Sequence, residues 1–264
     1  MRSIPGALES ILVQVLRTVI YGGLLLAAEY AAHQVGLLDG STLANQVFSC
    51  LKYWVTGVYA TESSDIVGEA DSYANLLHLR PGMTICEMGA ADGSLMARVG
   101  KHVMPGGTLI ATSPSNAELR ATAAAAAAAG LGTVRTYLAT STDWAPGLPP
   151  DTCDAIYSRM VIHMVRDWTI QKYIPQWAAA LKPNGRMFMT DHNPSDGRTG
   201  GPKRPIEWRF GVVPMMWVLP QDTEVAQITK GGPFELLEGP FYHPFFYNGY
   251  GAVYGLPGSA KAKG

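Results

Sequence analysis

The pattern of hydrophobic and polar positions predicts an α/β fold in the middle of the chain. Short β-type runs alternate there with helix-type runs. The expected strands are 83–88, 108–112, 134–138, 154–158 and 186–191, and the expected helices are 94–103, 116–129 and 170–181. Strands that alternate with helices predict βαβ units and a mostly parallel sheet with helices on both faces.

Turn and capping residues mark the boundaries of these elements. Pro81-Gly82 precedes the first strand. The Ala-rich helix 116–129 has Ser115 and Glu118 at capping-box spacing, and Gly130 stands where a C-terminal glycine belongs. Two further runs, 234–241 and 245–254, predict an antiparallel pair of strands that closes the sheet.

The first 78 residues are expected to form a helical N-terminal extension or lid, ahead of a domain at 79–264 with a substrate loop or insert at about 193–230. Residues 7–38 are apolar, but Glu9, Arg17 and Glu29 interrupt them. The longest uncharged stretch falls short of the roughly 20 residues that span a bilayer. Three interpretations stay open: a helix packed on its own domain or on a second copy, a helix on a membrane surface, and a signal peptide.

Composition limits the classes of function. The chain is 47% hydrophobic and 16% charged, which is enough apolar material for a real core. Its net charge of -1 gives no electrostatic case for binding nucleic acid. Cys50, Cys86 and Cys153 are far apart and form no CxxC motif, so we expect ordinary buried thiols in a reducing compartment and no structural zinc.

A small-residue turn between the first strand and the first helix is the main candidate for a ligand site. It reads Glu87, Met88, Gly89, Ala90, Ala91, Asp92 and Gly93. Ligands of open α/β sheets bind at the carboxyl ends of the strands, and small residues let the backbone approach a ligand closely. The turn does not have the GxGxxG spacing of a dinucleotide site.

The turn resembles the acid-x-Gly-x-Gly-x-Gly motif of class I S-adenosylmethionine (SAM)-dependent methyltransferases. Three later segments, 141–144, 150–165 and 181–186, resemble further motifs of that family, and 150–165 is similar to its ubiquinone/menaquinone methyltransferase-like (type 11) branch. The resemblance covers about residues 80–192. It implies a seven-stranded Rossmann-like methyltransferase sheet, with SAM as methyl donor and S-adenosylhomocysteine as product.

The resemblance also implies roles for individual residues. Glu87 would serve the amino acid portion of SAM, and Asp143 would cap the adenine amino group with Trp144 beside the ring. The family acid that binds the ribose at the end of the second strand is missing, and Thr112 or Ser113 would be a weaker, neutral partner. The expected cofactor residues are Glu87, Gly89, Ala90, Ala91, Asp92, Gly93, Thr112, Ser113, Asp143, Trp144 and Ser158.

Catalysis of methyl transfer needs orientation, and a base if the acceptor carries a proton. His163 follows the fourth strand, and Asp191 and His192 end the fifth, so these three are the catalytic candidates. A structural histidine is the alternative for His163. We expect no metal, because the fourth strand does not supply a further acid beside Asp191.

Four residues are candidates for contact with a substrate, and all except Arg159 lie outside the motif segments. They are Tyr53, Arg159, Trp208 and Trp217. The aromatic residues could wall an apolar pocket or only pack in a core or dimer contact, and Arg159 could bind an anion or pair with a neighbouring acid.

These features predict a methyltransferase for a small, partly apolar acceptor at oxygen, carbon, nitrogen or sulfur. The alternative is a binding or scaffold protein on a degenerate methyltransferase fold without turnover. The expected partners are a small molecule and no nucleic acid, with peripheral membrane contact or homo-oligomers through the N-terminal helices. Because SAM is made in the cytosol, we expect a cytoplasmic protein, with membrane association as an alternative.

Overall fold

The computed structural model describes residues 56–61, 63–165, 167–194, 198–201, 204–208, 211–230, 232–245 and 248–259. The chain divides into two compact units, Met1–Glu62 and Ser63–Gly264. The N-terminal helices expected before residue 56, Tyr53 among them, lie outside the described residues. Within the described part of the chain, no helix has both the length and the apolar character needed to cross a membrane.

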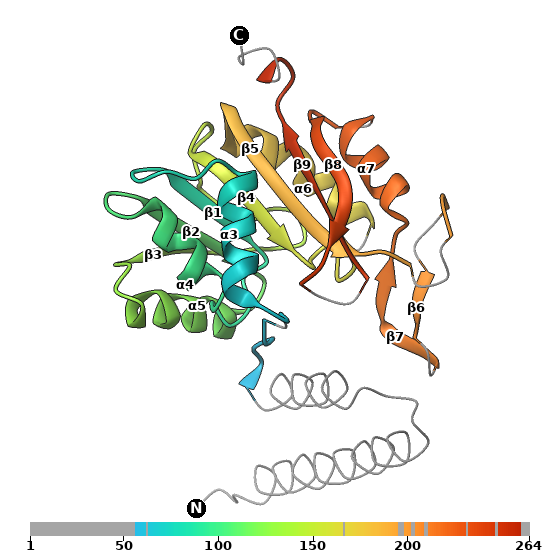
Figure 1. Ribbon diagram of the computed structural model, residues 1–264, viewed down its shortest axis with the longest axis horizontal. Helices are drawn as coiled ribbons and strands as arrows, with labels where there is room; N and C mark the ends of the chain where they lie inside the picture. Colours follow the sequence, from blue (N-terminus) through green and yellow to red (C-terminus); the bar gives the residue numbers. More distant parts are fainter. Residues whose placement is uncertain are drawn as a thin grey trace, which may run out of the picture. The chain divides into compact units, whose positions relative to one another are not determined.

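The second unit contains a seven-stranded sheet in the order β3-β2-β1-β4-β5-β9-β8 (Figure 1). The strands are β1 (Thr84–Met88), β2 (Thr108–Ser113), β3 (Val134–Leu138), β4 (Cys153–Arg159), β5 (Leu181–His192), β8 (Glu235–His243) and β9 (Gly249–Gly255). The first five strands are parallel, and β9 runs antiparallel to both β5 and β8. The predicted sheet and its antiparallel closing strands are confirmed.

Helices cover both faces of the sheet (Figure 1). They are α3 (Ile66–Leu76), α4 (Met96–Val99) with the 3₁₀ turn η1 (Gly100–Val103), and α5 (Asn116–Ala128) on one face, and α6 (Asp167–Ala180) and α7 (Gln221–Thr229) on the other. Successive strand residues point to opposite faces, so Leu109 joins the hydrophobic cluster under α5 while Ile110 joins the one under α6. Burial on both faces explains the apolar runs at the centres of the inner strands, such as Leu109–Ala111 in β2, all of which is fully buried.

Helix α3, whose residues fall in the stretch expected as the N-terminal extension, belongs to the compact unit that holds the sheet. The Asp65 side chain caps the helix by accepting hydrogen bonds from the N–H groups of Val67 and Gly68. Tyr73 is fully buried in the core, and its hydroxyl lies 2.9 Å from the Thr190 hydroxyl on β5. This helix therefore packs directly on the sheet.

A hairpin occupies part of the segment expected to be an insert. It consists of β6 (Arg204–Trp208) and β7 (Gly211–Val218), which pair antiparallel. Pro205 and Pro214 interrupt the two runs, and proline normally argues against a strand. The sequence pattern therefore gave no prediction of this hairpin.

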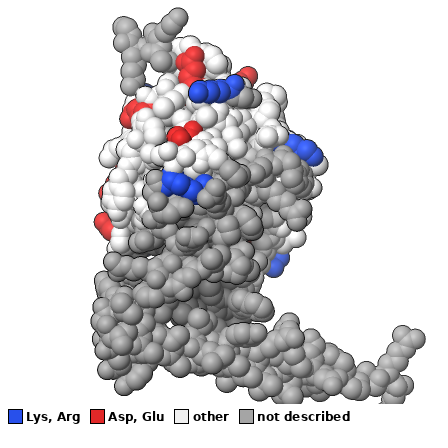
Figure 2. All heavy atoms as spheres, turned by 90° about the vertical axis from the view of Figure 1, so that its right-hand side faces the viewer, with Lys and Arg blue, Asp and Glu red and all other residues white. Residues whose placement is uncertain are grey.

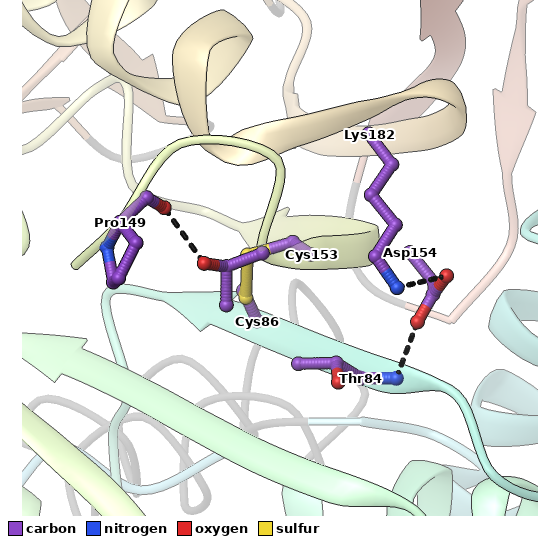
Figure 3. Close-up of a disulfide and its surroundings, with 7 residues drawn as sticks. Thr84, Cys86, Pro149, Cys153, Asp154 and Lys182 are labelled. Atoms are coloured by element: carbon purple, nitrogen blue, oxygen red, sulfur yellow. Dashed lines mark hydrogen bonds and ion pairs between the residues drawn. A yellow bond between two sulfur atoms is a disulfide. The ribbon is translucent and has the colours of Figure 1, made fainter.

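A disulfide between Cys86 and Cys153 corrects our expectation of separate buried thiols (Figure 3). The two residues are 67 positions apart, but β1 and β4 are direct neighbours in the sheet, which leaves their Cα atoms 6.1 Å apart. Both are fully buried. Sequence spacing could not reveal this pair, and cysteine usage no longer argues for a reducing compartment.

Asp154, at the start of β4, contacts residues at the starts of the strands β1 and β5 beside the disulfide (Figure 3). Its carboxylate accepts a hydrogen bond from the Thr84 N–H at 2.7 Å and pairs with the Lys182 ammonium at 2.7 Å. These contacts lie at the amino ends of β1, β4 and β5. The opposite, carboxyl edge of the sheet carries the candidate site.

Candidate functional site

Contacts with β2 and α5 hold the turn after β1 in place. The N–H groups of Gly89 and Ala90 donate to the Thr112 carbonyl at 3.0 and 2.8 Å. Gly93 has a φ of +76°, and a Cβ there would lie 2.4 Å from the Thr122 Cα on α5. Glycine is therefore required at Gly93, both by the backbone conformation and by the close approach of α5.

Glu87 brings a buried carboxylate to this turn at 5% exposure, and its Oε2 atom has no hydrogen-bond partner. Burial raises the pKa of Glu87 to about 8, and the nearby carboxylates of Asp92 and Glu118 act in the same direction. Tyr157 and Arg159 lower this pKa, but by less. A buried acceptor without a partner is costly, so the site fits a cationic ligand group such as the ammonium of SAM.

Asp92 and Ser158, two other residues of the expected cofactor set, differ in whether their side chains have hydrogen-bond partners within the protein. The Asp92 carboxylate accepts hydrogen bonds from the N–H and the hydroxyl of Ser94, at 3.1 and 2.6 Å, and so shapes the start of the following helix. Ser158 on β4 pairs in register with Met88 at the end of β1, and its buried hydroxyl has no partner. Glu87 and Ser158 are thus the two polar groups here that a ligand would satisfy.

The end of β2 holds a carboxylate that sequence reasoning missed. The Ser113 hydroxyl donates to the Glu118 carboxylate at 2.5 Å, and both side chains are buried. Glu118 lies in the first turn of α5, and Ser115 caps that helix by accepting from the Glu118 N–H. The capping-box spacing pointed to Glu118 only as a local feature of the helix.

Asp143 and Trp144, in the segment after β3, differ in how exposed their side chains are. Asp143 is partly exposed, and its carboxylate accepts the Ala145 N–H at 3.0 Å. Trp144 is 2% exposed and lies in the hydrophobic cluster with Ile110 and Ile156. Of the two, Asp143 has the side chain that is open to a ligand.

His163 and Asp191 form a buried pair at the ends of β4 and β5. The His163 Nδ1 lies 2.7 Å from Asp191 Oδ1, and the His163 N–H donates to Asp191 Oδ2 at 2.9 Å. The residues are 4% and 2% exposed. A carboxylate on Nδ1 fixes the tautomer that donates from Nδ1, which leaves Nε2 as the basic nitrogen.

His192 completes this group of catalytic candidates. Its N–H donates to Asp191 Oδ1 at 2.7 Å, and its ring lies 5.3 Å from the His163 ring, centroid to centroid. Burial opposes ionisation of Asp191, but the imidazoles of His163 and His192 and the His192 N–H together hold its pKa below the usual value. The carboxylate therefore stays ionised and can stabilise a protonated His163.

Arg159 pairs with an acid, which was one of the two alternatives for this residue. Its guanidinium Nε lies 2.6 Å from Oε1 of Glu69, a fully buried residue of α3, and a second nitrogen lies 3.3 Å from Oε2. The bidentate contact commits much of the cation to Glu69. Trp208 and Trp217 lie in β6 and β7, but their side chains, like Tyr53, lie outside the described residues.

Charged side chains of both signs are scattered over the described part of the face in Figure 2. Within the described residues, no three His, Cys, Asp or Glu side chains come together as a metal-binding group. The polar groups that the structure places at the candidate site are the Glu87 and Asp92 carboxylates, the Ser158 hydroxyl and the His163–Asp191 pair.

Comparison with known proteins identifies the domain. Residues 69–228, more than half of the chain, match the family model described as a methyltransferase domain. The chain is 30% identical over 137 residues to nocamycin O-methyltransferase from Saccharothrix syringae. That alignment covers 52% of this chain and 45% of the relative, so the chain matches less than half of that protein's length.

Solved structures share the fold. A SAM-dependent methyltransferase from Aquifex aeolicus aligns with a TM-score of 0.56 at 18% identity, over 70% of this chain and 88% of that one. A SAM-dependent methyltransferase from Mesorhizobium loti aligns with a TM-score of 0.52 at 17% identity, over 72% of this chain and 99% of that one.

Proposed function

The chain belongs to the SAM-dependent methyltransferases, and on this basis we propose that it methylates a hydroxyl oxygen of a small, partly apolar molecule. The observation that carries this proposal is the buried contact of 2.7 Å between His163 Nδ1 and Asp191 Oδ1. A histidine oriented by a carboxylate is a base, and a base is needed when the accepting atom carries a proton.

The proposed role of each residue follows from that contact. SAM, when bound, would supply a methyl group on a positively charged sulfur, and the sulfur would keep the electrons of the broken sulfur–carbon bond as S-adenosylhomocysteine leaves. The acceptor therefore needs only to be oriented and deprotonated. His163 Nε2 accepts the hydroxyl proton as the oxygen forms its bond to the methyl carbon. Asp191 keeps Nδ1 protonated and stabilises the resulting imidazolium.

A phenolic or enolic hydroxyl is the acceptor that best suits this base. A phenol has a pKa near 10, within a few units of an imidazole, whereas water and similar hydroxyls lie near 16. The similarity to a protein named as an O-methyltransferase supports oxygen as the acceptor atom. The resemblance of residues 150–165 to the ubiquinone/menaquinone branch supports an aromatic or quinol-like ring.

The test compares acceptors that differ only in the group that would receive the methyl. The protein is incubated with SAM and a phenol, the matching aniline and the matching methyl ether, and S-adenosylhomocysteine and product mass are measured. We expect turnover with the phenol alone, and its loss in His163→Gln while the dissociation constant for S-adenosylhomocysteine is kept. His102→Gln is the matched control, because His102 is partly exposed and pairs with Asp71 on the surface.

Two results would contradict the proposal. One is methylation of the aniline at a rate equal to that of the phenol. The other is an unchanged kcat for the phenol in His163→Gln at pH 7.

A further inference from the structure

The end of β2 lacks the acid expected there, yet the structure places a carboxylate beside it. Ser113 ends the strand at 1% exposure, and its hydroxyl contacts Glu118 Oε2 at 2.5 Å. The same hydroxyl oxygen accepts the Ser115 N–H at 2.9 Å. Its proton is therefore directed at the carboxylate, which orients Glu118 toward the strand end.

The local fold explains how Glu118 comes to this position. Helix α5 begins at Asn116, with Ser115 as its cap, so Glu118 lies in the first helical turn. A carboxylate is favoured there by the helix dipole. At 6% exposure, however, Glu118 is far more buried than the acid of a solvated helix end needs to be.

A second observation connects Glu118 with the ligand turn, the small-residue turn Glu87–Gly93 at the end of β1. Glu87 on the adjacent strand β1 has a buried Oε2 without a partner, and the charge of Glu118 acts on this group. Glu87 and Glu118 are therefore close enough to interact electrostatically beside the turn Gly89–Gly93. An unpartnered acceptor at 5% exposure indicates that this region is built for a ligand with donors.

We propose that Glu118, held by Ser113, supplies from the first turn of α5 the carboxylate that binds the two ribose hydroxyls of SAM. A carboxylate has two oxygens and accepts from two neighbouring hydroxyls at once, which neither Thr112 nor Ser113 does as strongly. Ser113 is then a positioning residue. The proposal depends on the cofactor of the family and not on the acceptor or on His163.

The test measures binding and not turnover. Dissociation constants for S-adenosylhomocysteine and for its 2′-deoxy and 3′-deoxy analogues are measured by titration calorimetry. In the unaltered protein we expect each missing hydroxyl to weaken binding about 10- to 100-fold, as for hydrogen bonds to a charged group. In Glu118→Gln we expect this preference for the full ribose to fall to roughly threefold or less.

A purely structural role of Glu118 predicts a different result. Glu118→Gln would then weaken all three ligands by one factor and leave the ribose preference unchanged, which would overturn the proposal. Glu235→Gln is the matched control, because Glu235 is exposed on β8, at the opposite end of the sheet from β2 and β3. It should alter neither the affinities nor the preference.

Ser113 offers a second route if Glu118→Gln does not fold. Ser113→Ala should reduce the ribose preference, and Ser113→Thr, which keeps a hydroxyl, should restore it. Equal preferences in these two variants would also overturn the proposal. The binding data are independent of the acceptor, so failure here leaves the proposed oxygen methylation to its own test.

Discussion

His163 contacts the Asp191 carboxylate twice. Its ring nitrogen Nδ1 lies 2.7 Å from Oδ1, and its backbone N–H donates to Oδ2 at 2.9 Å. His163 follows β4, and Asp191 lies near the end of the neighbouring parallel strand β5. Because both contacts are buried, the carboxylate fixes the position of the residue and the tautomer of its ring together.

Asp191→Asn should lower kcat by about 10²- to 10⁴-fold, because the amide no longer stabilises a protonated imidazole. The dissociation constant for S-adenosylhomocysteine should change by less than about threefold, since Asp191 acts on the base and not on the cofactor. Single-turnover kinetics and calorimetry measure the two quantities. A large loss of cofactor affinity with an unchanged kcat would assign Asp191 to cofactor binding instead.

Glu87 should make cofactor binding release a proton at neutral pH. With a pKa of about 8, the ligand-free carboxyl is mostly protonated at pH 7, and a cationic ligand favours its ionised form. Calorimetry in buffers of different ionisation enthalpy counts the protons. Glu87→Gln is the control for the titration of the ligand itself, and an equal proton count in both proteins would contradict the prediction.

The same pKa gives the sign of a stability effect. The pKa of Glu87 in the folded protein, about 8, lies above its ordinary value of 4.5, so the unfolded chain loses its proton first as pH rises. Glu87 therefore destabilises the ligand-free protein progressively from about pH 4.5 to about pH 8. Urea unfolding should show that Glu87→Gln raises the free energy of unfolding of the ligand-free protein by more at pH 8 than at pH 5.

Gly93→Ala should destabilise the protein more than Gly130→Ala. Both glycines have similar φ angles, +76° and +73°, but an added Cβ would lie 2.4 Å from the Thr122 Cα at Gly93 and would meet nothing within 4 Å at Gly130. We expect a cost of about 1–2 kcal/mol at Gly130 from backbone strain, and about 1–3 kcal/mol more at Gly93. Equal urea midpoints for the two variants would contradict this prediction and would show that α5 shifts to accommodate the added methyl group.

Removal of the Cys86–Cys153 disulfide should lower the free energy of unfolding by about 4 kcal/mol, given a closed loop of this length. The comparison is urea unfolding of Cys86→Ala/Cys153→Ala against the unaltered protein, with and without reductant. Thiol titration of the denatured chain should find two fewer thiols before reduction than after it. Full thiol reactivity without reductant would contradict the disulfide.

The sequence predicted the topology well, because parallel strands buried on both faces leave a strong pattern of apolar runs between turns. It selected His163 and Asp191 separately, but their contact depends on β4 and β5 being neighbours. The disulfide was missed for the same reason, since Cys86 and Cys153 meet only when β1 and β4 pair. Glu118 was read as a helix cap because that local role already explained its spacing. The assigned roles in cofactor binding and catalysis stay predictions.

The disulfide also makes a covalent ring of residues 86–153, which contains the ligand turn, β2, α5 and β3. A protease that cuts one exposed loop inside this ring leaves both pieces joined through sulfur. A single cut beyond residue 153 instead separates the chain into two polypeptides once it is denatured. The part of the protein that carries Glu87, Ser113 and Glu118 is therefore the part that survives nicking as one molecule.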